Sequence, residues 1–245
     1  MNSNLAFYKS SIGKKWIVAI TGLMMVGFVV GHLIGNLQVF LGWESLNRYA
    51  AFLKSIGELL WIVRVALIIA VVAHIVATIQ LALANRAARP EKYERKRAVK
   101  ASLMGRTMIW SGAYLLCFVV VHLLHFTILV IHPEYREMKD ALNRPDVFHM
   151  VLIGFSNPLM SGFYIVGMLL LCSHLAHGIG SMTQTLGIQT RKLTCLFTCG
   201  GRALAVLLAI GYISIPVAVL AGYGKEYRER GAAPLKTTAL VNQKH

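Results

Sequence analysis

The sequence is poor in charge, and it is poorest in acidic residues. Only 14% of its 245 residues are Asp, Glu, Lys or Arg, whereas 56% are hydrophobic. Because a soluble domain is usually about one quarter charged, this composition argues against an ordinary soluble protein and favours a polytopic membrane protein. The first residues also lack the pattern of a cleaved signal peptide, since the apolar run that begins at Trp16 is too long and has no small-residue cleavage site.

The four cysteines lack the spacing of any familiar attachment motif. Cys117, Cys172, Cys195 and Cys199 form neither the CxxCH motif of covalently attached haem nor a zinc-binding pattern. They do not reveal the redox compartment. The net charge of +15 does not predict nucleic-acid binding, because the basic residues lie in short loops between apolar stretches.

Five apolar stretches are each about 20 residues or longer, which is enough to cross a hydrocarbon layer of roughly 30 Å. No internal repeat stands out. The sequence therefore predicts an all-α membrane protein, a bundle of five transmembrane helices in residues 1–224, followed by a polar C-terminal tail in residues 225–245. The predicted spans are 16–41, 59–84, 107–131, 158–186 and 203–223.

The charges of the loops predict the orientation of these spans. The segment 86–106 holds eight Lys or Arg against two Glu, and the head and the fourth loop are basic without any acid. The positive-inside rule places these three segments in the cytoplasm, and with five spans the C-terminus then lies outside.

Four of the predicted spans each contain a histidine deep inside the apolar run. Ionisable groups at membrane depth are costly and are usually functional. His32 and His122 follow the last basic residue before their spans by nearly equal intervals, about 25 Å along a helix, and both spans start inside, which puts these histidines in the outer half. His74 and His174 lie equally deep in spans that start outside, which puts both in the inner half. Two pairs at two depths predict two b-type haems with bis-histidine ligation.

Two further histidines complicate this assignment. His125 and His177 each lie one helical turn beyond a predicted ligand and share its broad helix face. Both could instead bond to haem propionates, to backbone or to a quinone. A single intramembrane histidine would more often serve packing or a proton relay, and the four at matched depths favour haem.

Other polar residues are candidates for cofactor binding. Arg64 suits a haem propionate in a bidentate arrangement, or it snorkels to the membrane surface. Arg106 and Lys15 could serve the inner haem's propionates or mark the membrane edge. A quinone pocket could be framed at the outer ends of the first two spans, although Trp at this level is also an ordinary interfacial anchor. The residues of this candidate pocket are Asn36, Gln38, Trp43, Glu58 and Trp61.

Several short motifs follow one another along nearly the whole chain, up to about Gly224. They are SSIGKK (10–15), TGLMMVGFVVGHLIGN (21–36), AHIV (73–76), RTMIWSG (106–112), VHLLHFT (121–127), FSNPL (155–159), HLAHG (174–178) and GRALAVL (201–207). In their order and spacing the sequence resembles a known family, the two-haem cytochrome b membrane anchor of succinate dehydrogenase and fumarate reductase (respiratory complex II) in its single-chain, five-helix form.

The resemblance implies the same four ligands, His32, His74, His122 and His174. It also implies a bacterial cytoplasmic membrane, a flavoprotein subunit with FAD and an iron–sulfur subunit docked on the cytoplasmic face, and a possible higher oligomer of the complex. Electrons would pass between the iron–sulfur subunit and membrane quinone, typically menaquinone, and succinate would not touch this chain. Some members carry a carboxylate near the ligand of the fourth helix, where this sequence has Leu171, Cys172 and Ser173.

Two alternatives remain open at this point. The chain could be the cytochrome b anchor of another respiratory dehydrogenase, such as a hydrogenase or a formate dehydrogenase, with its catalytic partner on the outer face. It could also be a haem-free transporter that uses histidines as proton relays.

Overall fold

The computed structural model describes residues 10–88, 103–187 and 190–230, and the described part is built almost entirely of helices. Five of them are long and apolar enough to cross a membrane, which confirms the predicted all-α membrane class. The long helices are α2 (Ser11–Asn36), α4 (Glu58–Ala87), α5 (Leu103–Phe126), α7 (Pro158–Thr185) and α8 (Arg191–Leu220). The short elements between and after them are the 3₁₀ helices η1 (Leu37–Leu41) and η2 (Pro133–Glu137), and the helices α3 (Trp43–Ser55), α6 (Val147–Ser156) and α9 (Lys225–Arg230).

Local signals in the sequence explain where the long helices begin. Ser10 caps α2 by accepting a hydrogen bond from the backbone N–H of Gly13 at 3.0 Å. Asn157 caps α7 in the same way through Leu159 N–H at 2.9 Å, and Pro158 occupies the first helical position, where no N–H is needed. Thr190 caps α8.

Several predicted boundaries are wrong, including the start of the first span, since α2 begins at Ser11 rather than at residue 16. The third span was expected to reach residue 131, but α5 ends at Phe126, and the chain turns through Leu129, whose φ is 59°. The fifth span was expected to begin at residue 203, but α8 begins at Arg191, so Arg202 lies inside a helix rather than in a loop. Basic side chains can extend along a helix to a polar surface, and for this reason an arginine near a helix start does not end the helix.

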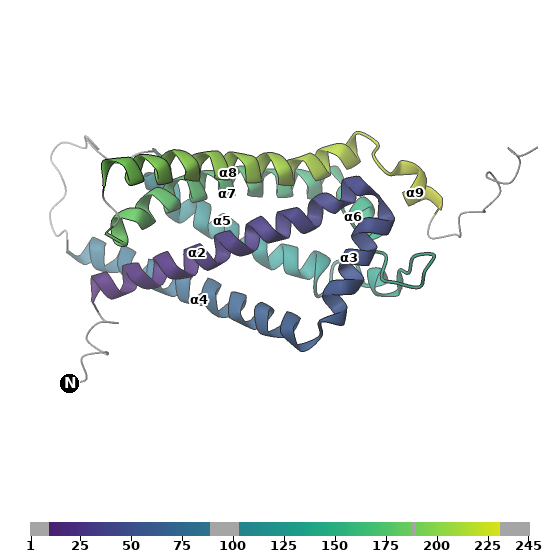
Figure 1. Ribbon diagram of the computed structural model, residues 1–245, viewed down its shortest axis with the longest axis horizontal. Coiled ribbons are helices and arrows are strands. Elements are labelled where there is room, and N and C mark those ends of the chain that lie inside the picture. The colour runs from purple at the N-terminus through teal and green to yellow at the C-terminus, as the bar shows by residue number, and fades with distance from the viewer. Residues whose placement is uncertain (1–9, 89–102, 188–189, 231–245) are drawn as a thin grey trace, which may run out of the picture.

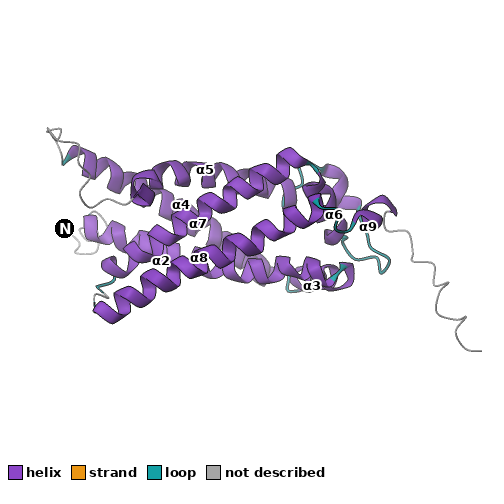
Figure 2. Ribbon diagram, turned by 90° about the horizontal axis from the view of Figure 1, so that it is seen from above, coloured by secondary structure: helices purple, strands orange, loops and turns teal. Residues whose placement is uncertain are grey.

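The two ends of the bundle differ in structure (Figures 1 and 2). At one end α2, α5 and α8 begin and α4 and α7 end; we call this the loop end. At the opposite end lie α3, α6 and α9; we call this the cap end. The start of α2 therefore lies at the loop end. The same end holds the helix ends that flank the two connections predicted to be cytoplasmic, which run from α4 to α5 and from α7 to α8. Which end faces the cytoplasm stays a prediction.

The long helices α2, α4, α5 and α7 form a four-helix bundle, in which some pairs are neighbours and others stand on a diagonal. Close backbone packing joins α2 to α4, α5 to α7 and α2 to α7, and α8 packs along α7 and α2. Three combinations of α2, α4, α5 and α7 lack such close packing: α4 with α5, which are the two ends of the packed row α4–α2–α7–α5, and the pairs α2 with α5 and α4 with α7, which lie across the bundle from one another. These diagonals are the ones that carry the histidine pairs.

Glycines allow the closest approaches between helices. A Cβ atom added at Gly167 of α7 would lie 2.6 Å from a ring carbon of Phe118 on α5. A Cβ atom at Gly211 of α8 would lie 2.8 Å from a methyl group of Leu33 on α2. Small residues at such positions are what allows membrane helices to pack closely.

We expect Gly167→Ala to destabilise the bundle by about 1–3 kcal/mol, because the added methyl group would force Phe118 out of its place. Thermal unfolding of the detergent-solubilised protein measures this effect. Gly162→Ala on the same helix is the matched control, since nothing lies within 4 Å of its added Cβ. Equal melting temperatures for the two variants would contradict the close packing of α5 against α7.

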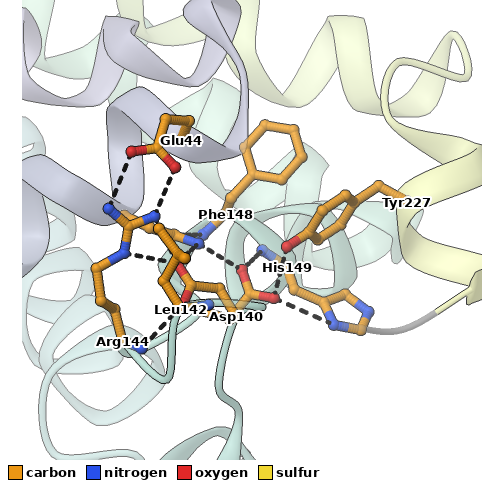
Figure 3. A network of polar contacts seen from close by, with 9 residues as sticks. Glu44, Asp140, Leu142, Arg144, Phe148, His149 and Tyr227 are labelled. Carbon is orange, nitrogen blue, oxygen red and sulfur yellow. Dashed lines mark hydrogen bonds and ion pairs between the residues drawn. The ribbon is translucent and has the colours of Figure 1, made fainter. Parts of the chain in front are cut away.

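A buried polar network holds the cap end together (Figure 3). The side chain of Asn47 on α3 is fully buried and donates to Asp146 at 3.0 Å and to Asp140 at 3.3 Å. Its carbonyl oxygen accepts from the backbone N–H of Phe148 at 2.9 Å. Tyr227 of α9 donates to the second oxygen of Asp146 at 2.9 Å. The network thus fastens α3, α6 and the first residues of the predicted tail to one another.

Arg144 connects this network to the surface. Its guanidinium group donates to Asp140 at 2.8 Å and, in a bidentate arrangement, to Glu44 at 3.1 and 2.8 Å. Burial by itself raises the pKa of Asp140, but hydrogen bonds from Arg144 and from the backbone of Leu142 outweigh burial and hold this pKa below its usual range. A carboxyl group with a lowered pKa stabilises the folded state above the pKa of the unfolded chain, and this stabilisation is lost as the pH falls through the lowered value.

We therefore expect the melting temperature of the protein to fall as the pH drops below about 4, the usual range of an Asp carboxyl. Asp140→Asn should be less stable than the wild type at pH 7 and should show a weaker decline on acidification. Glu137→Gln, an exposed carboxylate of the same connection, should follow the wild-type profile. If the melting temperatures of Asp140→Asn and of the wild type fell in parallel with decreasing pH, Asp140 would not control the acid sensitivity of the cap end.

Candidate functional site

The structure brings His32 of α2 and His122 of α5 together across one diagonal of the bundle. Their ring centroids are 5.8 Å apart, with the ring planes at 76°. Metal–imidazole bonds of about 2 Å would place the centroids of two rings on opposite sides of one ion roughly 6 Å apart. Phe28 stacks on His32 and Phe118 stacks on His122, so apolar rings flank both imidazoles. We call His32 and His122 the cap-side pair.

The second diagonal carries His74 of α4 and His174 of α7, which we call the loop-side pair. The two imidazoles lie close enough to interact electrostatically. Each of them also has a hydroxyl partner on its neighbouring helix. His74 Nδ1 lies 3.1 Å from Thr21 Oγ1 of α2, and His174 Nδ1 lies 3.1 Å from Ser111 Oγ of α5.

The donor chemistry fits an axially ligated haem better than a metal ion held by protein alone. Among the described residues, no group of three or more His, Cys, Asp or Glu side chains could hold a metal ion. A zinc site takes at least three protein ligands, whereas a haem iron already has the four porphyrin nitrogens and takes imidazoles only as axial ligands. A pair of imidazoles at each of two levels is sufficient for that type of cofactor.

A tyrosine links the cap-side pair to His125. Tyr164 Oη lies 3.4 Å from His122 Nδ1 and 3.2 Å from His125 Nδ1. The hydroxyl has one proton, so it can donate to one imidazole and must accept from the other. If the hydroxyl accepts from Nδ1 of His122, it donates its own proton to Nδ1 of His125. The Nε2 atom of His122 then carries a lone pair, and the ring of His125 carries its proton on Nε2. That Nε2 atom is buried and has no hydrogen-bond partner among the described residues.

His125 therefore lies in the wall of the bundle beside Tyr164. It is 0% exposed, and its ring stacks on Phe126 with centroids 3.9 Å apart. The rings of His132 and Tyr135 lie next to it on the side of the cap. His177 is half-buried and interacts electrostatically with His174.

The other predicted cofactor residues are more scattered. The guanidinium carbon of Arg64 lies 5.1 Å from the ring centroid of Trp61, a cation–π contact on the same helix. Lys15 is exposed at the loop end. Arg106 belongs to α5, but its side chain lies outside the described part of the structure.

The residues of the predicted quinone pocket all lie towards the cap end, but within the described part of the chain no hydrogen bond, ion pair or ring contact joins them to one another. The amide of Asn36 donates to the backbone oxygen of His32 at 2.8 Å, within its own helix. Glu58 and Trp61 are exposed on α4. Gln38 accepts from Ser45, and Trp43 packs against Tyr227. The pocket stays a prediction.

Sequence reasoning missed Thr21, Ser111 and Tyr164. A signal for the first two was present, because the interval from Thr21 to His32 equals the interval from Ser111 to His122, and a glycine follows each hydroxyl residue. The segments 21–32 and 111–122 agree at five of twelve positions, a stretch too short to stand out as an internal repeat.

Comparisons with known proteins identify no relative of this chain. No family model, curated protein or solved structure matches this chain. A function is therefore inferred from the site itself and from the motifs of the sequence.

Tyr164→Phe should destabilise the protein by about 1–3 kcal/mol, because it leaves two buried Nδ1 atoms without their shared hydroxyl. The free energy of unfolding in detergent measures this loss. Tyr49→Phe is the control, since the half-buried Tyr49 hydroxyl makes no hydrogen bond within the described part of the chain. A loss no larger than that of the control would mean that Tyr164 does not hold the two imidazoles.

Proposed function

We propose that this chain is the membrane-anchor cytochrome b subunit of a succinate:quinone oxidoreductase or fumarate reductase, with two bis-histidine b-type haems. The observation that carries the proposal is the placement of two imidazole pairs on the two diagonals of one helix bundle. The sequence motifs support the choice of family. In this function the chain is an electron-transfer and quinone-binding subunit rather than the enzyme that acts on succinate.

The residues of the chain would hold and orient the cofactors. His32 and His122 would be the axial ligands of one haem, and His74 and His174 those of the other. A haem, when bound, supplies one-electron redox chemistry, and its axial ligands and their hydrogen bonds set the potential. Thr21 lies at the level of the loop-side pair and shares α2 with His32, so the helical rise puts the two levels about 16 Å apart along α2.

The two ends of the bundle suit different partners. Basic residues lie in the helix ends at the loop end: Lys14 and Lys15 near the start of α2, Arg86 in the last turn of α4 and Lys192 in the first turn of α8. The basic residues of 89–102 lie outside the described residues. We propose that this end faces the cytoplasm and docks the iron–sulfur and flavoprotein subunits. Quinone, with menaquinone as the expected species, would bind near the cap end, where Glu58, Asn36 and Trp61 are candidates. Arg64, Arg106 and Lys15 remain candidates for the haem propionates.

One observation favours a second candidate function. Tyr164 joins His122 and His125 in a row of polar groups inside an apolar bundle, which is the type of arrangement that a haem-free transporter would use as a proton relay. An anchor for a hydrogenase or formate dehydrogenase would keep the haems, and its catalytic partner would bind at the cap end.

A set of single histidine variants tests the ligand assignment. His32→Ala and His122→Ala should each lose the same haem, and His74→Ala and His174→Ala should each lose the other, because nothing nearby replaces an axial ligand. Haem content from the pyridine haemochrome assay and reduced-minus-oxidised spectra of the purified variants measure the losses. The controls His125→Ala and His177→Ala should keep both haems.

Two outcomes would count against the assignment. If His122→Ala kept both haems while His125→Ala lost one, the ligand on α5 would be the wrong histidine. A wild-type protein that is folded and free of haem would overturn the cytochrome function and leave the relay as the better explanation.

A further inference from the structure

Two hydroxyl groups occupy equivalent places in the bundle. Thr21 on α2 contacts the ring of His74 on α4, and Ser111 on α5 contacts the ring of His174 on α7, both at 3.1 Å and both through Nδ1. Both hydroxyl residues are buried, with exposures of 8% and 3%. The same contact thus occurs twice, once in each pair of neighbouring helices.

Each hydroxyl has a hydrogen-bond acceptor on its own helix. Thr21 Oγ1 donates to the carbonyl oxygen of Ile17 at 2.6 Å, and Ser111 Oγ donates to the carbonyl oxygen of Met108 at 3.1 Å. A hydroxyl has a single proton, so towards the imidazole each of these oxygens can only accept. If each hydroxyl keeps this bond to its own helix, the proton of the contact sits on Nδ1 of His74 and of His174.

This arrangement fixes which ring nitrogen faces the bundle. A neutral imidazole that carries its proton on Nδ1 has its lone pair on Nε2, and the partner of Nδ1 also sets the orientation of the ring. The glycine after each hydroxyl residue lies beside the ring, where an added Cβ atom would make an ordinary van der Waals contact. A Cβ atom at Gly22 would lie 3.5 Å from His74 Cε1, and one at Gly112 would lie 3.6 Å from His174 Cε1.

We propose that Thr21 and Ser111 are positioning residues that hold the loop-side imidazoles in the Nδ1-protonated form and present Nε2 of both to a single haem iron. The inference rests on the proposed cytochrome function. Each of α2 and α5 then serves both levels. It carries an axial ligand at the cap side and, closer to its own start, the hydroxyl that orients a ligand of the neighbouring helix.

The choice of a hydroxyl has a consequence for the redox potential. A hydrogen-bond acceptor on Nδ1 raises the basicity of the ligand and stabilises the ferric state of an iron bound at Nε2. A hydroxyl carries no charge, so it does this without adding a carboxylate to the apolar bundle. Removing the acceptor should therefore favour reduction of the loop-side haem and leave the cap-side haem unchanged.

The test is a redox titration of purified Thr21→Val and Thr21→Ser, with haem content measured on the same samples. Thr21→Val should keep both haems. At a fixed potential, the ratio of reduced to oxidised loop-side haem should rise roughly two- to tenfold. This rise corresponds to an upward shift of the midpoint potential of at most about 59 mV for one electron. Thr21→Ser keeps the acceptor and should titrate like the wild type. Ser111→Ala should shift the same haem in the same direction, which keeps the test independent of how well Thr21→Val folds.

Thr78→Val is the matched control, because the Thr78 hydroxyl bonds to the backbone oxygen of His74 at 2.7 Å and not to its ring. An unshifted potential in both Thr21→Val and Ser111→Ala, with two haems present, would overturn this inference and leave the cytochrome function standing. Equal shifts in Thr21→Val and Thr21→Ser would also overturn it, since packing alone would then explain the effect. Absence of haem from the wild type would instead overturn the proposed function together with this inference.

Discussion

The imidazole rings inside the bundle must find hydrogen-bond partners where water is scarce. An unpaired polar group in an apolar environment costs several kcal/mol, on the order of a lost buried hydrogen bond or more. Three of the four histidines on the diagonals meet this requirement on one ring nitrogen through a hydroxyl of another helix: Thr21 for His74, Ser111 for His174 and Tyr164 for His122. The other ring nitrogen is then left for a partner inside the bundle.

This requirement explains much of the helix arrangement. The hydroxyl of a neighbouring helix can reach a ring only if the two helices pack closely, as α2 does with α4 and α5 with α7. The two rings of each pair belong to helices on a diagonal of the bundle, where the backbones stay further apart. Glycines such as Gly167 bring α7 against α5, and the polar network of Asn47, Asp140 and Asp146 closes the cap end above the bundle.

The sequence was sufficient to predict the number of long apolar helices and their alternation, because these depend on local hydrophobicity and on the fixed rise of a helix. It was not sufficient for the start of α8 at Arg191, since basic residues inside a helix look like a loop in a linear sequence. The network at the cap end was also out of reach, because Asn47 and Asp146 are 99 residues apart in the chain.

The partners of the histidines were missed for a similar reason. Thr21 and Ser111 are ordinary polar residues in apolar helices, and only the packing of neighbouring helices shows that they meet a ring 53 and 63 residues away in the chain. The family, the haems, the quinone and the soluble partners were inferred from the histidines and the motifs, and they remain predictions that a cofactor analysis can test.

The most direct measurement is the electron paramagnetic resonance spectrum of the oxidised wild-type protein, combined with its haem content per chain. We predict two haems per chain and two distinct low-spin ferric signals, each typical of an iron with two imidazole ligands. A folded protein without haem, or one that binds a single haem, would contradict the central claim that the two diagonals of the bundle each hold one.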